Sequence, residues 1–518
     1  MDKAKKKQVF YLLGKIILGM AIPFVISSIF LYLDGGQSIR KIMPSYNDED
    51  FYFHQIKAIL TYGQPLGYYG YDGSHALIGN FGFHGFIILV PYAVFGSLFG
   101  MKFYTMALTN IGLMAVCNLI YVLLYKPGYK RLFSFSILIL SPMLLYFINT
   151  NMVEGENYFF AVISAMLMVR ILQNGEKRTL KIALGVFIAW AILSKITWTI
   201  LVFPYLLILL KNNRRLSGML KGVLAGGVTV FSGAVGYAIF LLFRASYFKH
   251  LSLMELYAEY ITTDGLWQGF SFIFEAVRKN MAITWLDSGP PWLTVCRVFI
   301  IVMGIFAVAF AILEHRENTL SFIPAYMVLG FIFGVAILYA GGREAVRTVY
   351  AGGVFAQAFM LTELLQVRRK KFKKVFTGVS VLFFILGFII QATWGWGVYK
   401  RHYYDPNNQA YYQKLEQYMG LMEPQVDAAN PWDNTLVLTL SSYPDRIYEL
   451  FIPTGIGLNY YRYLPQDLSG FEAGYILLSN GNLEDKKRLR ESGYFVLAED
   501  ENTTLLSRIS RKEDIKGE

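Results

Sequence analysis

Long apolar runs recur along most of this chain and constrain its fold more than any other feature. A bilayer core of about 30 Å is crossed by a helix of roughly 20 apolar residues. The run at 181–210 is too long for one membrane-crossing helix and too short for two helices of full length. Because Ser194 and Lys195 interrupt it, we expect a hairpin of two short helices there. The pattern predicts about eleven transmembrane helices. The other runs lie at 9–32, 103–125, 132–148, 157–173, 219–243, 291–313, 319–340, 346–366 and 375–396.

Composition agrees with a membrane protein and excludes other classes. The 518 residues are 55% hydrophobic and only 16% charged, whereas soluble domains contain about 25% charged residues. A chain with this much aromatic and aliphatic surface does not stay disordered. Cys117 and Cys296 both lie in apolar runs, so neither a disulfide framework nor a cysteine zinc site is expected. The first apolar run is too long for a cleaved signal peptide and predicts a retained span.

The placement of basic residues predicts the topology. The formal net charge is +12, with clusters at 126–131, 177–181, 211–215 and 368–374. With about eleven crossings, all of these clusters fall on the side of the N-terminal lysines, which the positive-inside rule makes cytoplasmic. Counting 84–96 as a span would invert the later loops, so we expect a helix lying at the outer interface. Topology accounts for much of the charge, and no nucleic-acid partner is expected.

The same topology divides the chain into two predicted domains of a multi-pass cell-membrane protein. An all-α polytopic membrane domain occupies 1–398 and includes two large outer loops, 33–102 and 244–290. A small extracytoplasmic α/β domain occupies 399–518, because the short apolar stretches TLVLTL, GYILLS and YFVLAED alternate there with polar, partly helical sequence.

Two groups of carboxylates stand near the predicted outer membrane edge. Asp48, Glu49 and Asp50 follow the first span, and Glu154 and Glu156 occupy the short loop before the fourth. Charge close to the hydrocarbon is costly and usually functional. Crowded carboxylates there have raised pKa values or recruit a cation, and either property suits acid–base chemistry. The alternatives are a solvated acidic loop for the first group and a helix-capping role for the second.

These motifs resemble those of the GT-C membrane glycosyltransferases. Asp48, Glu49 and Tyr52 match the family's Asp-Glu-x-x-Tyr motif, and Gly63 follows the expected helix. Glu154 stands five positions before the Phe-Phe pair at 159–160, where the family more usually has aspartate. The family uses polyprenyl-phosphate-linked sugars and includes the protein O-mannosyltransferases and the lipid A aminoarabinose transferase. The resemblance covers the membrane region and implies its fold.

The first outer loop departs from the family at one place. The Lys-Pro-Pro-Leu segment of the closest bacterial members is missing, and GSHALIGNFGFHG stands in its place. This segment contains His75, which we include among the candidate substrate-binding residues. The spacings of His54, His75 and His84 match no compact metal-ligand motif.

The resemblance also implies roles for the acidic residues. Asp48 would be the general base that takes the proton of the acceptor hydroxyl, with inversion at the sugar. Glu154, helped by Glu49 and Glu156, would orient the acceptor. Asp48 and Glu154 are the expected ligands if a divalent cation such as Mg or Mn takes part, a point on which the family varies.

Cations are needed because the lipid-phosphate leaving group carries charge. Arg343 and Arg347 lie near the start of the tenth span, where Arg347 and Tyr350 loosely match an Arg-Tyr pair of the family. Lys195, at the tip of the 181–210 hairpin, is similar to a family lysine. All three cations are candidates for phosphate contact, and the alternative for each is snorkelling to lipid headgroups.

The sequence thus predicts an enzyme that moves a sugar from a polyprenyl-phosphate donor to a cell-envelope glycan, lipid or protein. A transporter or flippase of lipid-linked sugars is the alternative, but it calls for ionisable residues at mid-span and repeated halves. No clear repeat is present, and the acidic groups gather at one edge. A membrane-anchored scaffold would not need carboxylates in two outer loops.

Overall fold

The computed structural model divides into two compact units. The first contains Met1–Arg40, Met106–Leu242 and His250–Lys400, and the second contains Lys41–Thr105, Phe243–Lys249 and Arg401–Glu518. The predicted boundary at 398/399 lies outside the described residues, and much of the first outer loop groups with the C-terminal region. The structure describes residues 3–45, 47–65, 69–71, 85–174, 177–243, 253–289, 291–314, 320–338, 345–364, 370–394, 403–424, 435–439, 446–461, 463–480 and 482–508.

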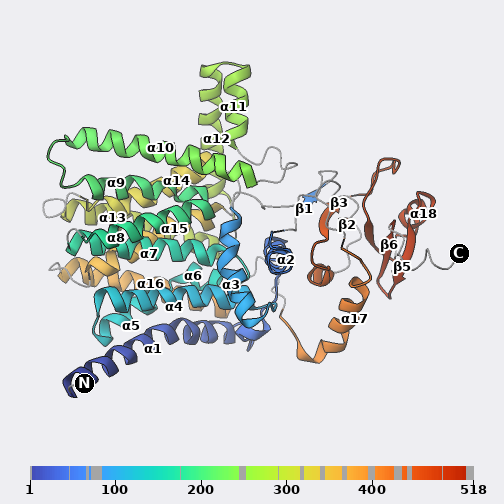
Figure 1. The fold of residues 1–518 in the computed structure, drawn as a ribbon, viewed down its shortest axis with the longest axis horizontal. Coiled ribbons are helices and arrows are strands. Elements are labelled where there is room, and N and C mark those ends of the chain that lie inside the picture. The colour runs from blue at the N-terminus through green and yellow to red at the C-terminus, as the bar shows by residue number, and fades with distance from the viewer. Residues whose placement is uncertain are drawn as a thin grey trace. The chain divides into compact units, whose positions relative to one another are not determined.

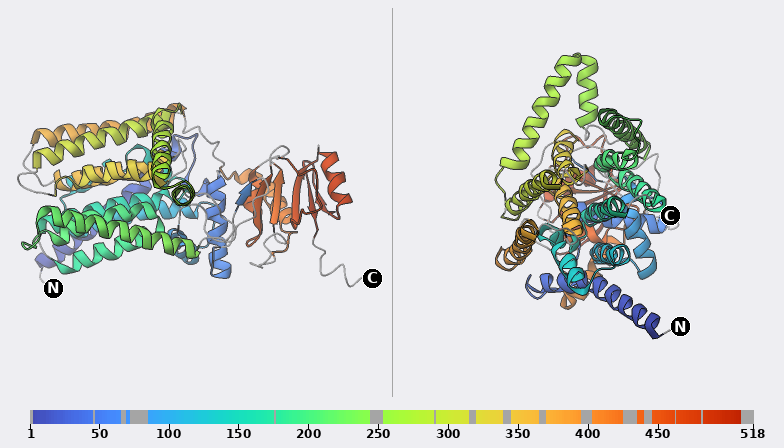
Figure 2. Two further views of the ribbon diagram at one scale, coloured as in Figure 1. Left: turned by 90° about the horizontal axis from the view of Figure 1, so that it is seen from above. Right: turned by 90° about the vertical axis from the view of Figure 1, so that its left-hand side faces the viewer.

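The first unit is a bundle of helices that run side by side (Figures 1 and 2). Within the described residues, six helices are long and apolar enough to cross a membrane. They are α1 (Lys3–Tyr32), α4 (Thr105–Tyr125), α7 (Glu154–Asn174), α10 (Gly218–Phe243), α13 (Pro291–Glu314) and α16 (Lys370–Trp394). The other helices of the unit are α5 (Tyr129–Leu138), α6 (Pro142–Ile148), α8 (Arg178–Ser194), η3 (Ile196–Leu201), α9 (Val202–Leu210), α11 (Leu253–Thr263), α12 (Leu266–Leu286), α14 (Ile323–Leu338) and α15 (Val346–Leu364). The predicted polytopic helical membrane domain is confirmed.

The expected hairpin at 181–210 is present as α8 followed by η3 and α9. Lys195 separates them in an extended conformation, with φ −155° and ψ 120°. The two arms are antiparallel, because the Tyr205 hydroxyl donates to the carbonyl of Lys181 at 3.1 Å. The run 132–148, predicted as one helix, is instead broken between α5 and α6. Ser141 is extended there because Pro142 disfavours a helical residue before it.

A polar side chain of α4 supplies the hydrogen-bond donor that a proline removes from α1. Pro23 has no backbone N–H, so the carbonyl of Gly19 lacks its usual partner within the helix. The buried Asn118 amide supplies one, since its Nδ2 donates to the Gly19 oxygen at 2.9 Å. Satisfying such a carbonyl is important in a bilayer, where water does not reach it.

Replacing Asn118 by Leu should therefore lower the free energy of unfolding by about 1–2 kcal/mol, because one backbone carbonyl loses its donor. Thermal unfolding of the purified protein in detergent measures this change. In a Pro23→Ala background the helix regains its own N–H donor, so the same substitution should cost less. Equal losses in both backgrounds would contradict this assignment of the Asn118 amide.

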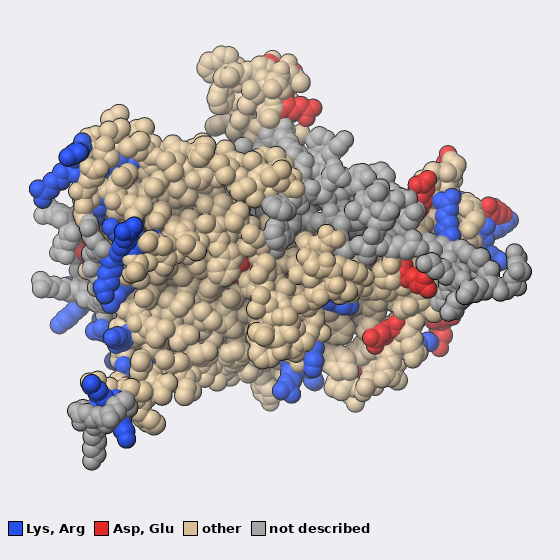
Figure 3. All heavy atoms as spheres, viewed as in Figure 1, with Lys and Arg blue, Asp and Glu red and all other residues tan. Residues whose placement is uncertain are grey.

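Basic residues gather at one end of the helical unit (Figure 3). Lys373, near the start of α16, lies within electrostatic reach of Lys130 and Arg131 at the start of α5. The start of α8 and the end of α9 carry further clusters. The structure thus brings together basic clusters that are far apart in the sequence, as the predicted topology requires.

The second unit contains a six-stranded sheet in the order β1-β3-β2-β4-β6-β5. The pairs β1–β3, β3–β2 and β2–β4 are parallel, whereas β6 is antiparallel to both β4 and β5. The predicted small C-terminal α/β fold is confirmed. The strands are β1 (Tyr69–Tyr71), β2 (Thr435–Thr439), β3 (Gly457–Tyr461), β4 (Tyr475–Ser479), β5 (Phe495–Glu499) and β6 (Thr503–Ser507), and the helices are α2 (Asn47–Tyr62), η2 (Phe86–Leu89), α3 (Val90–Phe99), η5 (Pro406–Asn408), α17 (Gln409–Met419), η7 (Arg446–Phe451) and α18 (Leu483–Glu491). The chain passes from the first unit to the second within the short helix η1 (Ile39–Lys41).

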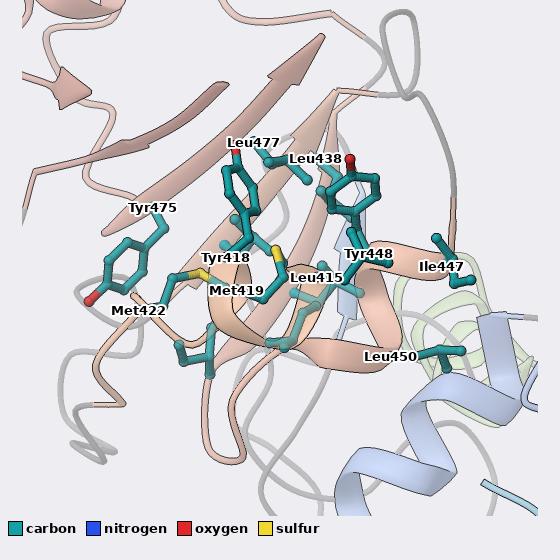
Figure 4. Close-up of a cluster of buried hydrophobic side chains, with 14 of the residues drawn as sticks. Leu415, Tyr418, Met419, Met422, Leu438, Ile447, Tyr448, Leu450, Tyr475 and Leu477 are labelled. Carbon is teal, nitrogen blue, oxygen red and sulfur yellow. The ribbon is translucent and has the colours of Figure 1, made fainter. Parts of the chain in front are cut away.

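Alternating side chains of the sheet enter two separate cores. Leu438 and Leu477 pack with Tyr418 and Met419 of α17 and with Tyr448 of η7 (Figure 4). Their neighbours along each strand point to the opposite face and pack with α18, as the two-residue period of a strand dictates. The first core also includes a phenylalanine of α2. Helix α2 is therefore fixed to the C-terminal domain by apolar packing.

Candidate functional site

In the first unit, the predicted cationic and acidic residues meet where three helices begin or end. Helix α7 begins at Glu154, so both of its carboxylates lie in the first turn, where the helix dipole favours negative charge. Arg347 lies in the first turn of α15. Its Nε is 3.2 Å from Oε1 of Glu154, with exposed side-chain fractions of 21% and 2%. The ion pair is therefore largely withdrawn from solvent on the carboxylate side.

The second cation of the site is Lys195, between α8 and η3. Its Nζ donates to the hydroxyl of Thr348 at 3.0 Å, next to Arg347 in α15. The preceding residue, Ser194, donates to Oε1 of Glu156 at 3.3 Å. These contacts close a ring that links the start of α7, the tip of the α8 hairpin and the start of α15. Glu154, Glu156 and Lys195, which are buried, and the partly exposed Arg347 thus form one cluster, which we call the charged ring.

Aromatic side chains lie beneath the charged ring. The Tyr158 hydroxyl donates to the backbone carbonyl of Arg347 at 3.3 Å. Its ring meets that of Tyr350 edge-on, with centroids 5.6 Å apart, and Tyr350 in turn stacks on Phe299 at 4.7 Å. The predicted substrate-binding residue Tyr350 is therefore adjacent to the ion pair and fully buried.

An asparagine of α4 donates two hydrogen bonds to the loop before α7. Nδ2 of Asn110 donates to the carbonyls of Thr150 and Met152 at 3.0 and 2.8 Å. Gly155 packs against the same side chain: a β-carbon added there would lie 2.3 Å from Oδ1 of Asn110. Asn110 therefore fixes the backbone that places Glu154 and Glu156, and it does so only if residue 155 has no side chain.

The first acidic group belongs to the second unit. Asp48, Glu49 and Asp50 occupy the first turn of α2 and are all buried, as is Tyr52. Oε2 of Glu49 accepts a hydrogen bond from the backbone N–H of Ser45 at 2.6 Å. Glu49 therefore ties the segment before α2 to the first turn of that helix. Asp48 lies in the same first turn.

His54 is held further along α2. Its Nε2 is 2.8 Å from the backbone carbonyl of Glu449 in η7; because a carbonyl only accepts, Nε2 carries the proton. Burial, helped by the nearby charge of Lys57, lowers the pKa of His54 from 6.5 to about 3. The imidazole is thus neutral at physiological pH and joins α2 to the C-terminal domain.

Acidification should weaken this contact between α2 and the C-terminal domain. Since the pKa of His54 is lower in the folded state, the unfolded chain binds the proton first, and stability present above pH 6.5 is lost as the pH falls toward 3. The slope is at most about 1.4 kcal/mol per pH unit. Thermal unfolding of the full chain in detergent, measured from pH 7 downward, should be less pH-dependent in His54→Gln, which keeps a donor but does not titrate. Identical profiles would contradict this account.

The sequence predicts several charged residues of the site, but not the residues that they contact. Arg343 and His75 lie outside the described residues. Ser194 enters the sequence analysis only as an interruption of its apolar run. Thr348, Tyr158 and Asn110 do not enter it, because a lone hydroxyl, phenol or amide in an apolar run gives no signal by itself. Among the described residues, no group of three or more His, Cys, Asp or Glu side chains is arranged to hold a metal ion. Asp48 and Glu154, the expected metal ligands, belong to different units.

No protein-family model and no curated protein sequence matches the chain. Among solved structures, ArnT from Cupriavidus metallidurans bound to undecaprenyl phosphate is similar, with 12% identity and a TM-score of 0.47 over 96% of this chain and 98% of that one. Its apo form gives 10% identity and a TM-score of 0.46 over the same shares. The oligosaccharyltransferase AglB from Archaeoglobus fulgidus, in complex with an inhibitory peptide and a dolichol-phosphate, gives 12% and 0.48 over 91% and 70%. At these values the likeness says nothing about individual side chains.

Proposed function

We propose that this chain is an integral-membrane glycosyltransferase. It takes a sugar from a polyprenyl-phosphate donor and transfers it to a hydroxyl of a cell-envelope glycan, lipid or protein at the outer membrane face. In this proposal the basic end of the helical unit is cytoplasmic, and the C-terminal domain is extracytoplasmic.

The observation that carries the proposal is the charged ring. It brings Lys195 and Arg347 together with two carboxylates at the end of the spans opposite the basic clusters. Buried ionisable groups at a membrane edge are costly and mark functional sites. A polyprenyl phosphate presents its charge at the membrane edge. A guanidinium and an ammonium in one cluster suit the binding of phosphate oxygens.

The residues divide the reaction between them. Asp48 takes the proton of the acceptor hydroxyl while that oxygen attacks the anomeric carbon. The bond between the anomeric carbon and the phosphate oxygen breaks with inversion, and its electron pair leaves with the lipid phosphate. Lys195 and Arg347 stabilise the charge on that phosphate. Glu154 and Glu156 orient the acceptor, and Tyr52 and Tyr350 contact the bound substrates.

The direct test uses purified full-length protein in lipid nanodiscs. It is incubated with a panel of polyprenyl-phosphate sugars and an envelope extract that supplies glycan, lipid and protein acceptors. We expect release of free lipid phosphate from at least one donor, in step with labelling of an acceptor. If every donor stays intact while lipid-linked sugar crosses the membrane of reconstituted vesicles, the protein is a flippase and the proposal is wrong.

A further inference from the structure

Helices α11 and α12 form a hairpin within the first unit. Gly265 starts α12 with a φ of 90°, a conformation that glycine adopts readily. Gly269 lies so close to α11 that an added β-carbon would be 2.3 Å from the Ile261 side chain. Tyr260 and Phe272 stack across the pair at 4.1 Å. The two helices are therefore closely packed and form one rigid element.

Polar side chains attach this hairpin to the ends of two helices of the bundle, α13 and α14. Arg297 of α13 donates from Nε to the carbonyl of Thr284 and from Nη1 to that of Asp287, both at 2.7 Å. It satisfies one carbonyl in the last turn of α12 and the carbonyl of the residue that follows the helix, neither of which has a partner within the helix. Asn280 and Tyr257 donate to carbonyls in the last turn of α14 at 2.9 Å each. The hairpin is thus fixed at the start of α13 and the end of α14.

This is the end of the bundle opposite the basic clusters. The last turns of α13 pack against the start of α16, through Phe306 and Phe310 against Phe372, so the start of α13 lies at the other end. The axes of α11 and α12 are roughly perpendicular to the axes of the spans, and the hairpin projects from the side of the bundle (Figures 1 and 2). A helix perpendicular to the spans and level with their ends lies parallel to the membrane plane.

The free part of α12 exposes an apolar stripe. Trp267 is 85% exposed, Phe270 52% and Phe274 74%, and their spacing places them along one side of the helix. Glu275 lies on the polar edge beside this stripe and forms an exposed ion pair at 3.7 Å with Arg278, which follows the stripe one turn further along the helix. The helix therefore has a packed face, a polar edge and an aromatic edge.

We infer that the hairpin is a membrane-surface element whose aromatic edge is embedded in the outer-face phospholipid leaflet at headgroup depth. A tryptophan with phenylalanines on one side and charges on the other is the arrangement that interfacial helices adopt. The exposed ion pair carries charges of both signs, so apolar contact drives the embedding and anionic lipids are not required. This inference takes the outer face from the proposed topology, but it does not depend on the proposed reaction.

A depth measurement tests it in the full-length protein. Because Cys117 and Cys296 are buried, the fluorophore NBD is attached to single cysteines introduced by Trp267→Cys or Phe274→Cys, and by Glu275→Cys as the matched control. Each labelled protein is placed in phosphatidylcholine nanodiscs and must elute as the unsubstituted protein does. Phe270→Cys replaces either apolar variant that fails this check.

The two apolar positions should show blue-shifted emission, and spin-labelled lipid should quench them at least about threefold more than position 275. Quenching should be strongest with the spin label near the lipid carbonyls, and aqueous iodide should quench position 275 most. Equal iodide quenching at all three positions would overturn the inference. So would protection from both quenchers, because it would indicate a protein partner or a second copy on this edge.

Discussion

Asp48→Asn is expected to reduce sugar transfer by about 10²–10⁴-fold, the usual contribution of a positioned general base. The amide is nearly the same size as the carboxylate but accepts no proton at neutral pH. Release of lipid phosphate by the variant, followed under single-turnover conditions, measures the loss. Because Asp48 is proposed to act in the transfer step and not in donor binding, we expect a fall in kcat and little change in donor affinity.

The matched control is Asp264→Asn, which makes the same replacement at an exposed position in the turn between α11 and α12. It should transfer sugar at the normal rate. Both variants should unfold at the temperature of the unsubstituted protein. Full turnover by a folded Asp48→Asn protein would remove Asp48 as the base while leaving the phosphate-binding role of the charged ring open.

Lys195→Ala is expected to lower turnover or weaken donor binding by about 10–100-fold, as for the loss of one charged contact. The substitution removes the ammonium that donates to Thr348 at 3.0 Å and leaves the charged ring with one cation fewer. Donor titrations with the wild type and the variant separate an effect on binding from an effect on kcat. Arg347→Ala should act in the same direction, and it also leaves Glu154 buried without its partner.

Arg178→Ala provides the control for this pair. It removes a cation from the same helix as the Lys195 hairpin, but at its exposed opposite end. Its donor titration should match that of the wild type. If Lys195→Ala and Arg347→Ala both matched it as well, the charged ring would have no part in donor binding, and the two side chains would serve only to hold α8 and α15 together.

Much of the fold could be predicted because apolar length and strand-like patterning are local signals. The break at Lys195 was visible, since a charged residue is costly in the middle of a membrane span and therefore indicates that the long apolar run turns there. The strands β2, β4 and β5 were visible as short apolar stretches. The division of 132–148 into two helices is not predicted, although Pro142 marks it, because the run as a whole is long and apolar enough for one span.

What could not be predicted depends on contacts between distant parts of the chain. Strand β1 pairs with β3 although nearly 400 residues separate Tyr69 from its partner Leu458, and a three-residue strand has no recognisable period. The donation from Asn118 to Gly19 likewise joins two spans. Within the charged ring, the sequence supplied the charged residues, but it gave no reason to select Thr348 or Asn110, whose importance arises only from their neighbours.

The close packing of Asn110 against Gly155 has a consequence for how this protein can change. Neither position is free to vary alone: a methyl group at 155 displaces the amide, and a shorter side chain at 110 releases two backbone carbonyls. A redesign that aims to move the two glutamates, for example to accept a bulkier acceptor, must alter both positions together. The placement of the two glutamates thus depends on a residue of another helix, outside the motif in which they stand.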